Sequence, residues 1–241
     1  MSKIEIIADT HCHTIASSHA YSTVMENIEA AKKRGLYAIA ITDHGKNMPN
    51  SPGKWYFKNL ICIPKFVNGV RVLKGIEANV IDYEGNLDDD REENSELEWM
   101  IASIHDYSIK GEGGIDACTN AWLEVAKNPL VNVIGHCGVE KFKFDYEKVI
   151  PEFGANGKVV EINNNSFYIR KDAIKNCLEI AKLCKKYGVR VVVNSDAHFC
   201  LQVGVFDNAI KMLEEIDFPK ELIINSSRKN FENYLEERGI L

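Results

Sequence analysis

The chain has 241 residues, of which 45% are hydrophobic and 27% are charged, and its formal net charge is −6. We expect residues 1–241 to form a single domain, because this length allows one large buried core. The acidic charge argues against an extended nucleic-acid-binding surface, although it is compatible with a local basic pocket for a phosphate. No stretch reaches the ~18 consecutive apolar residues of a membrane span, so we expect no membrane insertion.

The seven cysteines are an odd number and include no C-x-x-C pair. This pattern favours reduced thiols over a disulfide framework. The N-terminal sequence MSKIEIIAD also lacks a long apolar signal core. Together these features predict a cytoplasmic protein.

Short apolar runs alternate with amphipathic stretches along the chain. The strand candidates are residues 4–8, 37–42, 70–76, 99–104, 131–135, 158–162 and 189–194. The helix candidates are residues 23–34, 116–127, 145–154, 171–187, 205–216 and 228–238. The first helix begins with a capping box, Thr23 to Glu26, and ends at Gly35. This alternation predicts an α/β fold with a parallel sheet, either doubly wound or closed into a barrel.

Two segments have no clear periodicity. Residues 46–66 contain proline, glycine and aromatic residues, and a long segment of this kind after a strand is a candidate lid or substrate-facing loop. Residues 84–98 form the strongest charge run, which we expect to be a solvated loop or short helix. Cation binding by Asp88, Asp89 and Asp90 is a weaker alternative.

All seven histidines lie where a strand is expected to run into a loop, and Glu77 and Asp196 share such positions. A single histidine there is more often structural, but the whole set indicates a multinuclear metal centre. Six strand ends can meet at one point only if the sheet curls into a barrel, which favours a distorted TIM-like barrel with seven strands. The candidate metal ligands are His11, His13, His19, His44, Glu77, His105, His136, Asp196 and His198.

The first two ligands form a His-x-His pair, whose imidazoles should share one side of an extended segment. Cys12, between them, should point to the other side.

The motifs DTHCHT, ASSHAYST, AIAITDHG, LKGIEAN, HCG, EINNNSF and NSDAH occur in this order along nearly the whole chain. In this respect the chain resembles the PHP family of metal-dependent phosphoesterases, and within it the small stand-alone bacterial phosphatases of the YcdX type. The resemblance implies a distorted (β/α)7 barrel with three divalent metal ions, most often zinc, with manganese or iron in some positions.

The resemblance also implies how the ligands are shared. His11, His13, Glu77 and Asp196 would hold one ion, and Glu77 would bridge to a second ion held by His105 and His136. The third ion would be held by His19, His44 and His198. A carboxylate suits the bridging role because it offers two oxygens, whereas a neutral imidazole normally binds one metal through one nitrogen.

Adjacent divalent ions suit phosphoryl transfer, so we expect hydrolysis of a small phosphomonoester by a metal-bridging hydroxide, without a protein nucleophile. Asp9 and Asp43 are candidates to accept the second N–H of ligating imidazoles, or else they cap loops by bonding backbone amides. Arg170 and Lys171 follow the sixth strand and are candidate phosphate contacts, or a surface pair at a helix start. Asn163 is a candidate donor to the substrate or to a metal-bound water.

Two other functions use similar features. A metal-dependent amidohydrolase also has a barrel, a His-x-His pair and a late aspartate, but His19 and His198 would be surplus ligands, and a bridging lysine is not evident. A non-catalytic metal-binding module is the third alternative, although no ligand is missing from the set. The sequence does not identify the phosphorylated substrate, a preference for monoester or diester, or a homo-oligomeric state.

Overall fold

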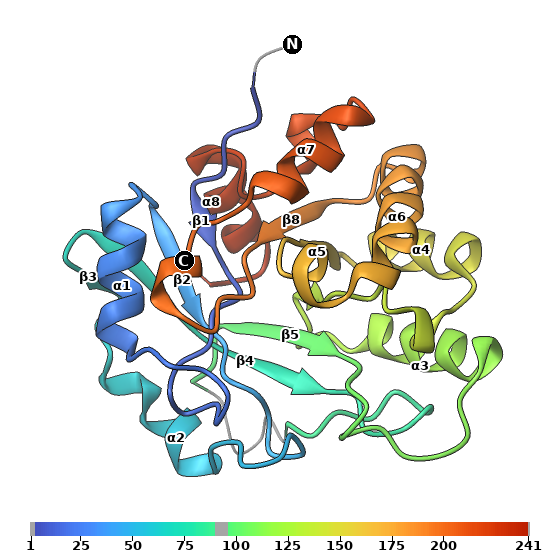
Figure 1. Ribbon diagram of the computed structural model, residues 1–241, viewed down its shortest axis with the longest axis horizontal. Coiled ribbons are helices and arrows are strands. Elements are labelled where there is room, and N and C mark those ends of the chain that lie inside the picture. The colour runs from blue at the N-terminus through green and yellow to red at the C-terminus, as the bar shows by residue number, and fades with distance from the viewer. Residues whose placement is uncertain (1–2, 90–95, 241) are drawn as a thin grey trace.

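A computed structural model describes residues 3–89 and 96–240 of the chain. Its parallel strands follow the order β1, β2, β4, β5, β6, β7 and β8, and β3 (Phe66–Val67) pairs antiparallel with β4. The bounds are β1 Ala8–Asp9, β2 Ala38–Ile41, β4 Val70–Asn79, β5 Trp99–Ser103, β6 Val133–Ile134, β7 Val159–Asn163 and β8 Val191–Asn194. The nearly closed sheet confirms the expected distorted barrel (Figure 1).

The first and last strands are joined mainly by side chains, of which Asn225 makes the most contacts with the strand backbones. The Asn225 Nδ2 group donates to the carbonyl oxygens of Ala8 and Val193, at 2.8 and 2.7 Å. Its Oδ1 accepts from the Val193 N–H at 3.1 Å. Beyond the strand ends, Cys12 and Ala197 form one isolated parallel bridge. Because buried backbone groups need partners, the buried Asn225 amide replaces part of a strand ladder between β1 and β8.

The sheet separates two hydrophobic clusters. The inner cluster combines inward-facing strand residues with Phe231, Tyr234 and Leu235 of the C-terminal helix α8 (Arg228–Glu237). The ring of Trp99, at the start of β5, lies 6.2 Å from that of Phe231 and 5.9 Å from that of Tyr234, between centroids. Helix α8 therefore fills the N-terminal end of the barrel, and the C-terminal strand ends are left for polar side chains. The larger, outer cluster lies between the sheet and the surrounding helices.

In Figure 1, α1 and α2 lie on one side of β4 and β5, and α3, α4 and α6 lie on the other. The expected capping box of α1 is present, since Thr23 and Glu26 exchange hydrogen bonds. The expected helix 171–187 begins instead as the 3-10 turn Lys171–Ala173. The remaining helices are α1 Val24–Lys33, α2 Lys54–Asn59, α3 Ile115–Lys127, α4 Tyr146–Ala155, α5 Ser166–Ile169, α6 Ile174–Tyr187 and α7 Asp207–Glu215. Within the described residues, no helix combines the length and apolar composition needed to cross a membrane.

The two aperiodic segments are more structured than their sequences indicate. Residues 46–66 contain α2, a 3-10 turn (Leu60–Cys62) and the first residue of β3, and Phe57 of α2 is buried. The expectation of a solvated acidic loop is wrong for Asp88, which is 3% exposed. Its carboxylate accepts from the backbone N–H groups of Asn47 and Asn79, so it fixes the loops after β2 and β4. Residues 90–95, which include Asp90, lie outside the described residues.

Candidate metal centre

Strand alternation directs the candidate ligands into the mouth of the barrel. Leu73 of β4 belongs to the inner cluster, and Glu77 lies four residues later, on the same face of the strand. Ile101 and His105 have the same relationship on β5 and in the loop after it. The inner hydrophobic cluster and the candidate ligands are thus successive layers of side chains inside the barrel.

Two ligand candidates need an unusual backbone. His136 and Asp196 have φ values of 23° and 55°, in the left-handed region that side chains other than glycine rarely adopt. His136 is three residues after the inward-facing Val133, so regular alternation would direct it outward. The turn directs its imidazole inward instead, and such outliers are typical of functional sites.

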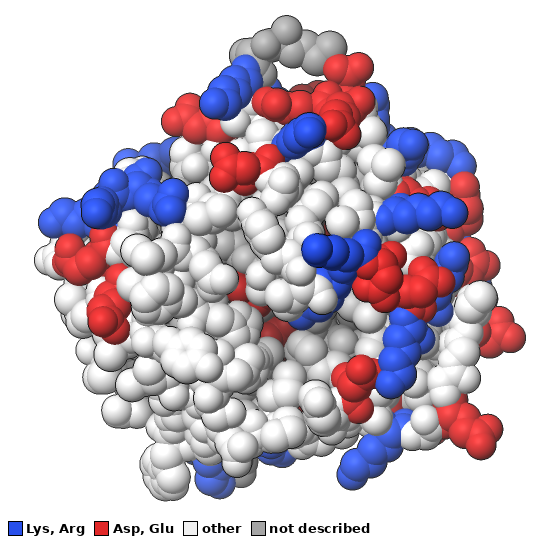
Figure 2. Space-filling model, in the orientation of Figure 1, with Lys and Arg blue, Asp and Glu red and all other residues white. Residues whose placement is uncertain are grey.

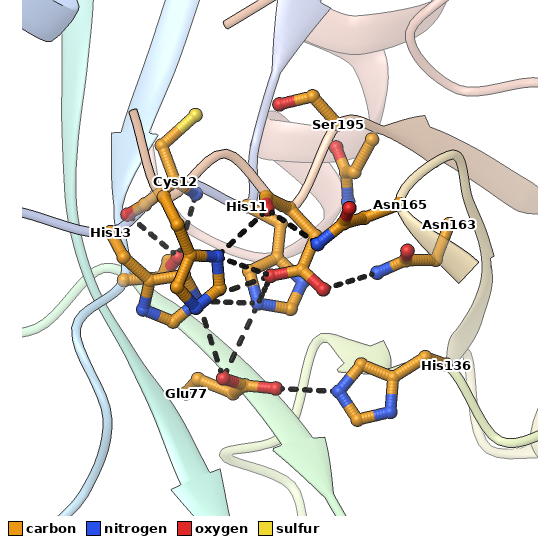
Figure 3. A network of polar contacts seen from close by, with 12 residues as sticks. His11, Cys12, His13, Glu77, His136, Asn163, Asn165 and Ser195 are labelled. Atoms are coloured by element: carbon orange, nitrogen blue, oxygen red, sulfur yellow. Dashed lines mark hydrogen bonds and ion pairs between the residues drawn. The ribbon is translucent and has the colours of Figure 1, made fainter. Parts of the chain in front are cut away.

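Side-chain atoms of four candidate ligands come together in the barrel mouth, and three of these residues, His11, His13 and Glu77, are labelled in Figure 3. The four atoms are His11 Nε2, His13 Nε2, Glu77 Oε2 and Asp196 Oδ1. Five of the distances among these atoms range from 3.1 to 3.5 Å. Four ligands at about 2.0–2.1 Å from one tetrahedral zinc ion lie about 3.3 Å apart. The five distances match that spacing, and His11, His13 and Asp196 are close enough together to hold one ion.

The two oxygens of Glu77 face different imidazoles. Oε1 lies 2.9 Å from His136 Nε2 and 3.4 Å from His105 Nε2. Oε2 faces the first group and lies 2.7 Å from His44 Nδ1, yet neither of these two atoms has a hydrogen-bond partner among the described residues. Buried polar atoms without partners are costly, and a shared cation would satisfy both. Glu77, His44 and His105 form a second group with metal-ligand spacing.

The remaining histidines adjoin these groups. His44 Nε2 lies 3.2 Å from His19 Nε2, and the ring centroids of His19 and His198 are 4.7 Å apart. His13, His44 and His198 form a third group with metal-ligand spacing. All nine expected ligands are thus brought together, and His44 lies between the second and third groups, with one ring nitrogen toward each.

The buried carboxylates and imidazoles of the centre change one another's pKa values. Burial alone would raise the pKa of Glu77, but the imidazoles of His11 and His44 outweigh burial and hold that pKa well below its usual range. Burial would lower the pKa of His11, but Glu161, Glu77 and Asp196 raise it well above the usual value. Burial and nearby imidazoles keep the pKa of His13 well below its usual value. Without a cation, the centre therefore combines ionised carboxylates, a neutral His13 and a protonated His11, so a metal ion that binds His11 would replace its proton.

Glu161 supports the centre and is not among the residues singled out from the sequence. Its Oε1 accepts from His11 Nδ1–H at 2.7 Å, which leaves His11 Nε2 directed at Glu77 and Asp196. Its Oε2 accepts from the backbone N–H of His136 at 2.8 Å. The available signal is a glutamate in the otherwise apolar run VVEI. A buried strand retains a carboxylate only where partners compensate it.

Asp9 and Asp43 bond to backbone and hydroxyl groups rather than to the ligating imidazoles, which was the other role expected of them. The Asp9 carboxylate accepts from the N–H and hydroxyl of Ser195 and from the Gly204 N–H. Asp43 accepts from Thr14, Ser17 and Tyr56. These contacts match the loop-capping alternative. Imidazole N–H groups are accepted instead by Glu161, from His11, and by Asn79 Oδ1, which lies 2.7 Å from His105 Nδ1.

The expected pairing of His11 and His13 is correct. Figure 3 shows both imidazoles directed toward Glu77 and the Cys12 thiol directed away from it.

The three residues expected to contact the substrate, Arg170, Lys171 and Asn163, differ in their exposure and in their distance from the centre. Arg170 Nη1 lies 3.3 Å from Asp196 Oδ2, and its side chain is 20% exposed at the mouth of the centre. Lys171 is exposed and lines neither cavity at the mouth. Asn163 is buried, and its Nδ2 donates to Glu161 and Asp196 at 3.1 Å each. The amide of Asn163 therefore holds two carboxylates in place, and Arg170 is the cation available to an incoming anion.

Two adjoining cavities open onto the centre. One, of about 320 Å³, lies directly over Glu77, Asp196 and His198. The other, of about 470 Å³, extends from His105 and His136 along the loops after β2, β5 and β6. Arg170 and Met48 line both. Figure 2 shows acidic side chains deep in a hollow of this face, beside a broad uncharged surface.

The fold and the ligand cluster define a barrel protein with three groups of potential metal ligands at its carboxyl rim. The PHP domain family model matches residues 9–196. A protein named probable phosphatase from Acetivibrio thermocellus is 46% identical over 235 residues, which are 98% of this chain and 97% of that protein. A probable phosphatase from Caldicellulosiruptor saccharolyticus is 46% identical over 231 residues, 96% of each chain. The chain therefore belongs to the PHP domain family.

Solved structures share the fold at low sequence identity. Histidinol phosphate phosphatase from Lactococcus lactis, complexed with zinc, L-histidinol and phosphate, has a TM-score of 0.58 at 14% identity, covering 97% of this chain and 94% of that one. A chain in an archaeal ribonuclease P structure with mature tRNA has a TM-score of 0.62 at 12% identity, covering 96% and 90%. These likenesses establish the fold.

Proposed function

We propose that the protein is a metal-dependent phosphatase that hydrolyses a small phosphomonoester at a trinuclear centre. The observation that carries the proposal is the close approach of His11, His13 and Asp196, with Glu77 Oε2 3.4 Å from both imidazoles of that group and Glu77 Oε1 facing His105 and His136. The names of its curated relatives, which align over nearly its whole length, support the reaction class.

Each set of residues has a defined role in this proposal. His11, His13, Glu77 and Asp196 hold the first ion, and Glu77 bridges to a second ion held by His105 and His136. His19, His44 and His198 hold the third ion. When bound, divalent ions there supply Lewis acidity toward phosphoryl oxygens and lower the pKa of coordinated water. Zinc fits the histidine-rich donor set, and manganese or iron is compatible with the first and second ions, whose ligands include carboxylates.

Arg170 orients the substrate. Its guanidinium lies beside Asp196 at the mouth of both cavities, where a phosphate would meet it. Guanidinium groups bind phosphate through paired N–H donors. In the reaction, a water oxygen forms a new bond to phosphorus and the ester P–O bond breaks. The alcohol leaves with one proton, and inorganic phosphate remains.

We also propose a cytoplasmic, reducing environment, because all seven cysteines are free. The proposed partner is a small phosphorylated molecule, which the volumes of the two cavities can accommodate.

The first experiment combines metal analysis of the purified protein with hydrolysis of p-nitrophenyl phosphate and of its bis-ester. We expect two to three transition-metal ions per chain and monoester hydrolysis that is lost on chelation and restored by zinc or manganese. Bound metal without hydrolysis of either ester would contradict the phosphatase proposal and favour an amidohydrolase or a metal-binding module. Absence of bound metal would contradict the ligand assignment itself.

A further inference from the structure

The larger of the two cavities has mainly uncharged walls. Met48 and Pro49 come from the loop after β2, and Ile104 and Tyr107 from the loop after β5. Val139 and Phe142 come from the loop after β6. Three separate loops thus contribute apolar surface to one volume of about 470 Å³. That volume is within the range of small-molecule sites, which are typically apolar with a few polar groups.

Charge is confined to two places in this cavity. Arg170, at the end next to the metal centre, is the only lysine or arginine among its described lining residues. Asp106, the acidic lining residue, lies 2.6 Å from Lys141 Nζ, and more than half of each side chain is exposed. The walls between these places therefore offer no cation to a second anionic group, and an additional phosphate or carboxylate would lose hydration without compensation.

This cavity lies where the alcohol portion of a bound phosphate ester, the leaving group of the proposed reaction, would extend. His105 and His136 line its inner end, and both face Glu77 Oε1. A phosphate bound between the centre and Arg170 would place its ester substituent in this cavity or in solvent. Apolar walls favour a substituent that buries hydrophobic surface.

We infer that this cavity binds the leaving group and selects phosphomonoesters whose alcohol portion is uncharged and predominantly apolar, of about the size of an aromatic ring with a short linker. This inference rests on the proposed phosphatase function and specifies its substrate class. Sugar phosphates and nucleotides with additional phosphates are the disfavoured classes.

The test uses metal-loaded protein and substrates matched in chemical reactivity. The esters 2-phenylethyl phosphate and ethyl phosphate both release a simple alkyl alcohol, so a difference in kcat/KM between them reports contacts with the substituent. Glucose 6-phosphate supplies a bulky polar comparison. We expect kcat/KM for 2-phenylethyl phosphate to exceed that for ethyl phosphate by about 10- to 100-fold, as for burial of an aromatic group, and to exceed that for glucose 6-phosphate.

A variant in the cavity wall links the preference to this site. Met48→Ser removes apolar surface, so the ratio of phenylethyl to ethyl kcat/KM should fall by about tenfold, mainly through KM. Met48→Leu should retain the preference. Met25→Ser is the matched control, because Met25 is 50% exposed on α1 and lines neither cavity. Metal content and thermal unfolding would verify that each variant is folded.

A binding measurement separates failure of this inference from failure of the proposed function. The non-hydrolysable 2-phenylethylphosphonate and ethylphosphonate can be titrated calorimetrically into the same metal-loaded protein. Tighter binding of the phenylethyl compound, weakened by Met48→Ser, supports the cavity assignment even if no ester is hydrolysed. Hydrolysis of all esters with equal kcat/KM, or equal affinity for both phosphonates, would overturn the inference and leave the phosphatase proposal intact.

Discussion

Glu161 Oε1 lies 2.7 Å from His11 Nδ1, and both side chains are fully buried. The contact fixes the tautomer that leaves His11 Nε2 available in the first ligand group. We expect Glu161→Gln to weaken zinc binding by about 10- to 100-fold, because a neutral amide no longer raises the basicity of the ligating His11 imidazole. Competition with a chromophoric chelator measures this affinity.

The matched control is Glu152→Gln, which changes an exposed glutamate of α4. It should leave zinc affinity unchanged. A Glu161→Gln protein that binds zinc within twofold of the parent would mean that Glu161 only fills a buried position.

Glu77→Ala should remove more metal than any single histidine substitution. Its two oxygens face separate imidazole sets, so the variant loses a ligand from both groups. We expect at least two of the proposed three ions to be lost, with hydrolysis reduced to background. Metal content per chain, compared with that of His19→Ala, measures the difference. Equal metal content in the two variants would be inconsistent with a bridging carboxylate.

The stability of the metal-free protein should depend on pH with a maximum near pH 6.5, the ordinary histidine pKa. The pKa of His13 is lowered on folding, so below pH 6.5 the unfolded chain binds more protons at this residue and stability decreases as pH falls. The pKa of His11 is raised, so above pH 6.5 the folded chain holds the extra proton and stability decreases as pH rises.

Urea unfolding of chelator-treated protein at pH 5, 6.5 and 8 measures this dependence. In His11→Gln, the decrease between pH 6.5 and 8 should be smaller than in the parent. If the parent instead became steadily more stable up to pH 8, the raised pKa of His11 would be refuted.

Asn225→Ala should destabilise the barrel by about 3 kcal/mol or more. The substitution leaves the carbonyl oxygens of Ala8 and Val193 and the Val193 N–H without their side-chain partner, and each buried unpaired group costs about 1–3 kcal/mol. Asn120→Ala, which removes a single exposed hydrogen bond to the Tyr83 carbonyl, should cost less than 1 kcal/mol, about the net value of an average hydrogen bond. Chemical denaturation of metal-free protein measures both, and similar values for the two variants would refute the closure role.

Features that repeat along the sequence were predictable from it. The alternation of apolar and amphipathic segments predicted the parallel barrel, and histidines at strand ends predicted that the candidate ligands would lie close together, because parallel strands in a barrel bring their carboxyl ends to one rim. The opposite orientations of Cys12 and its neighbouring histidines followed from strand geometry. These predictions depend on local period and chain direction alone.

Features that depend on distant contacts were not predictable in this way. Whether Asn163 contacts substrate or holds Asp196, and whether Asp9 accepts from an imidazole or from Ser195, depends on loops far apart in sequence. Neither Asn225 nor Glu161 shows its role in its own local sequence.

The sequence by itself therefore determined the family, the barrel and the identity of the candidate ligands. Only the tertiary structure decided which carboxylates support imidazoles, how β1 meets β8, and that a cavity with mainly uncharged walls adjoins the centre. The physical reason is that composition and periodicity fix which face of an element a side chain occupies, whereas its partner is fixed by how elements that are distant in sequence pack together.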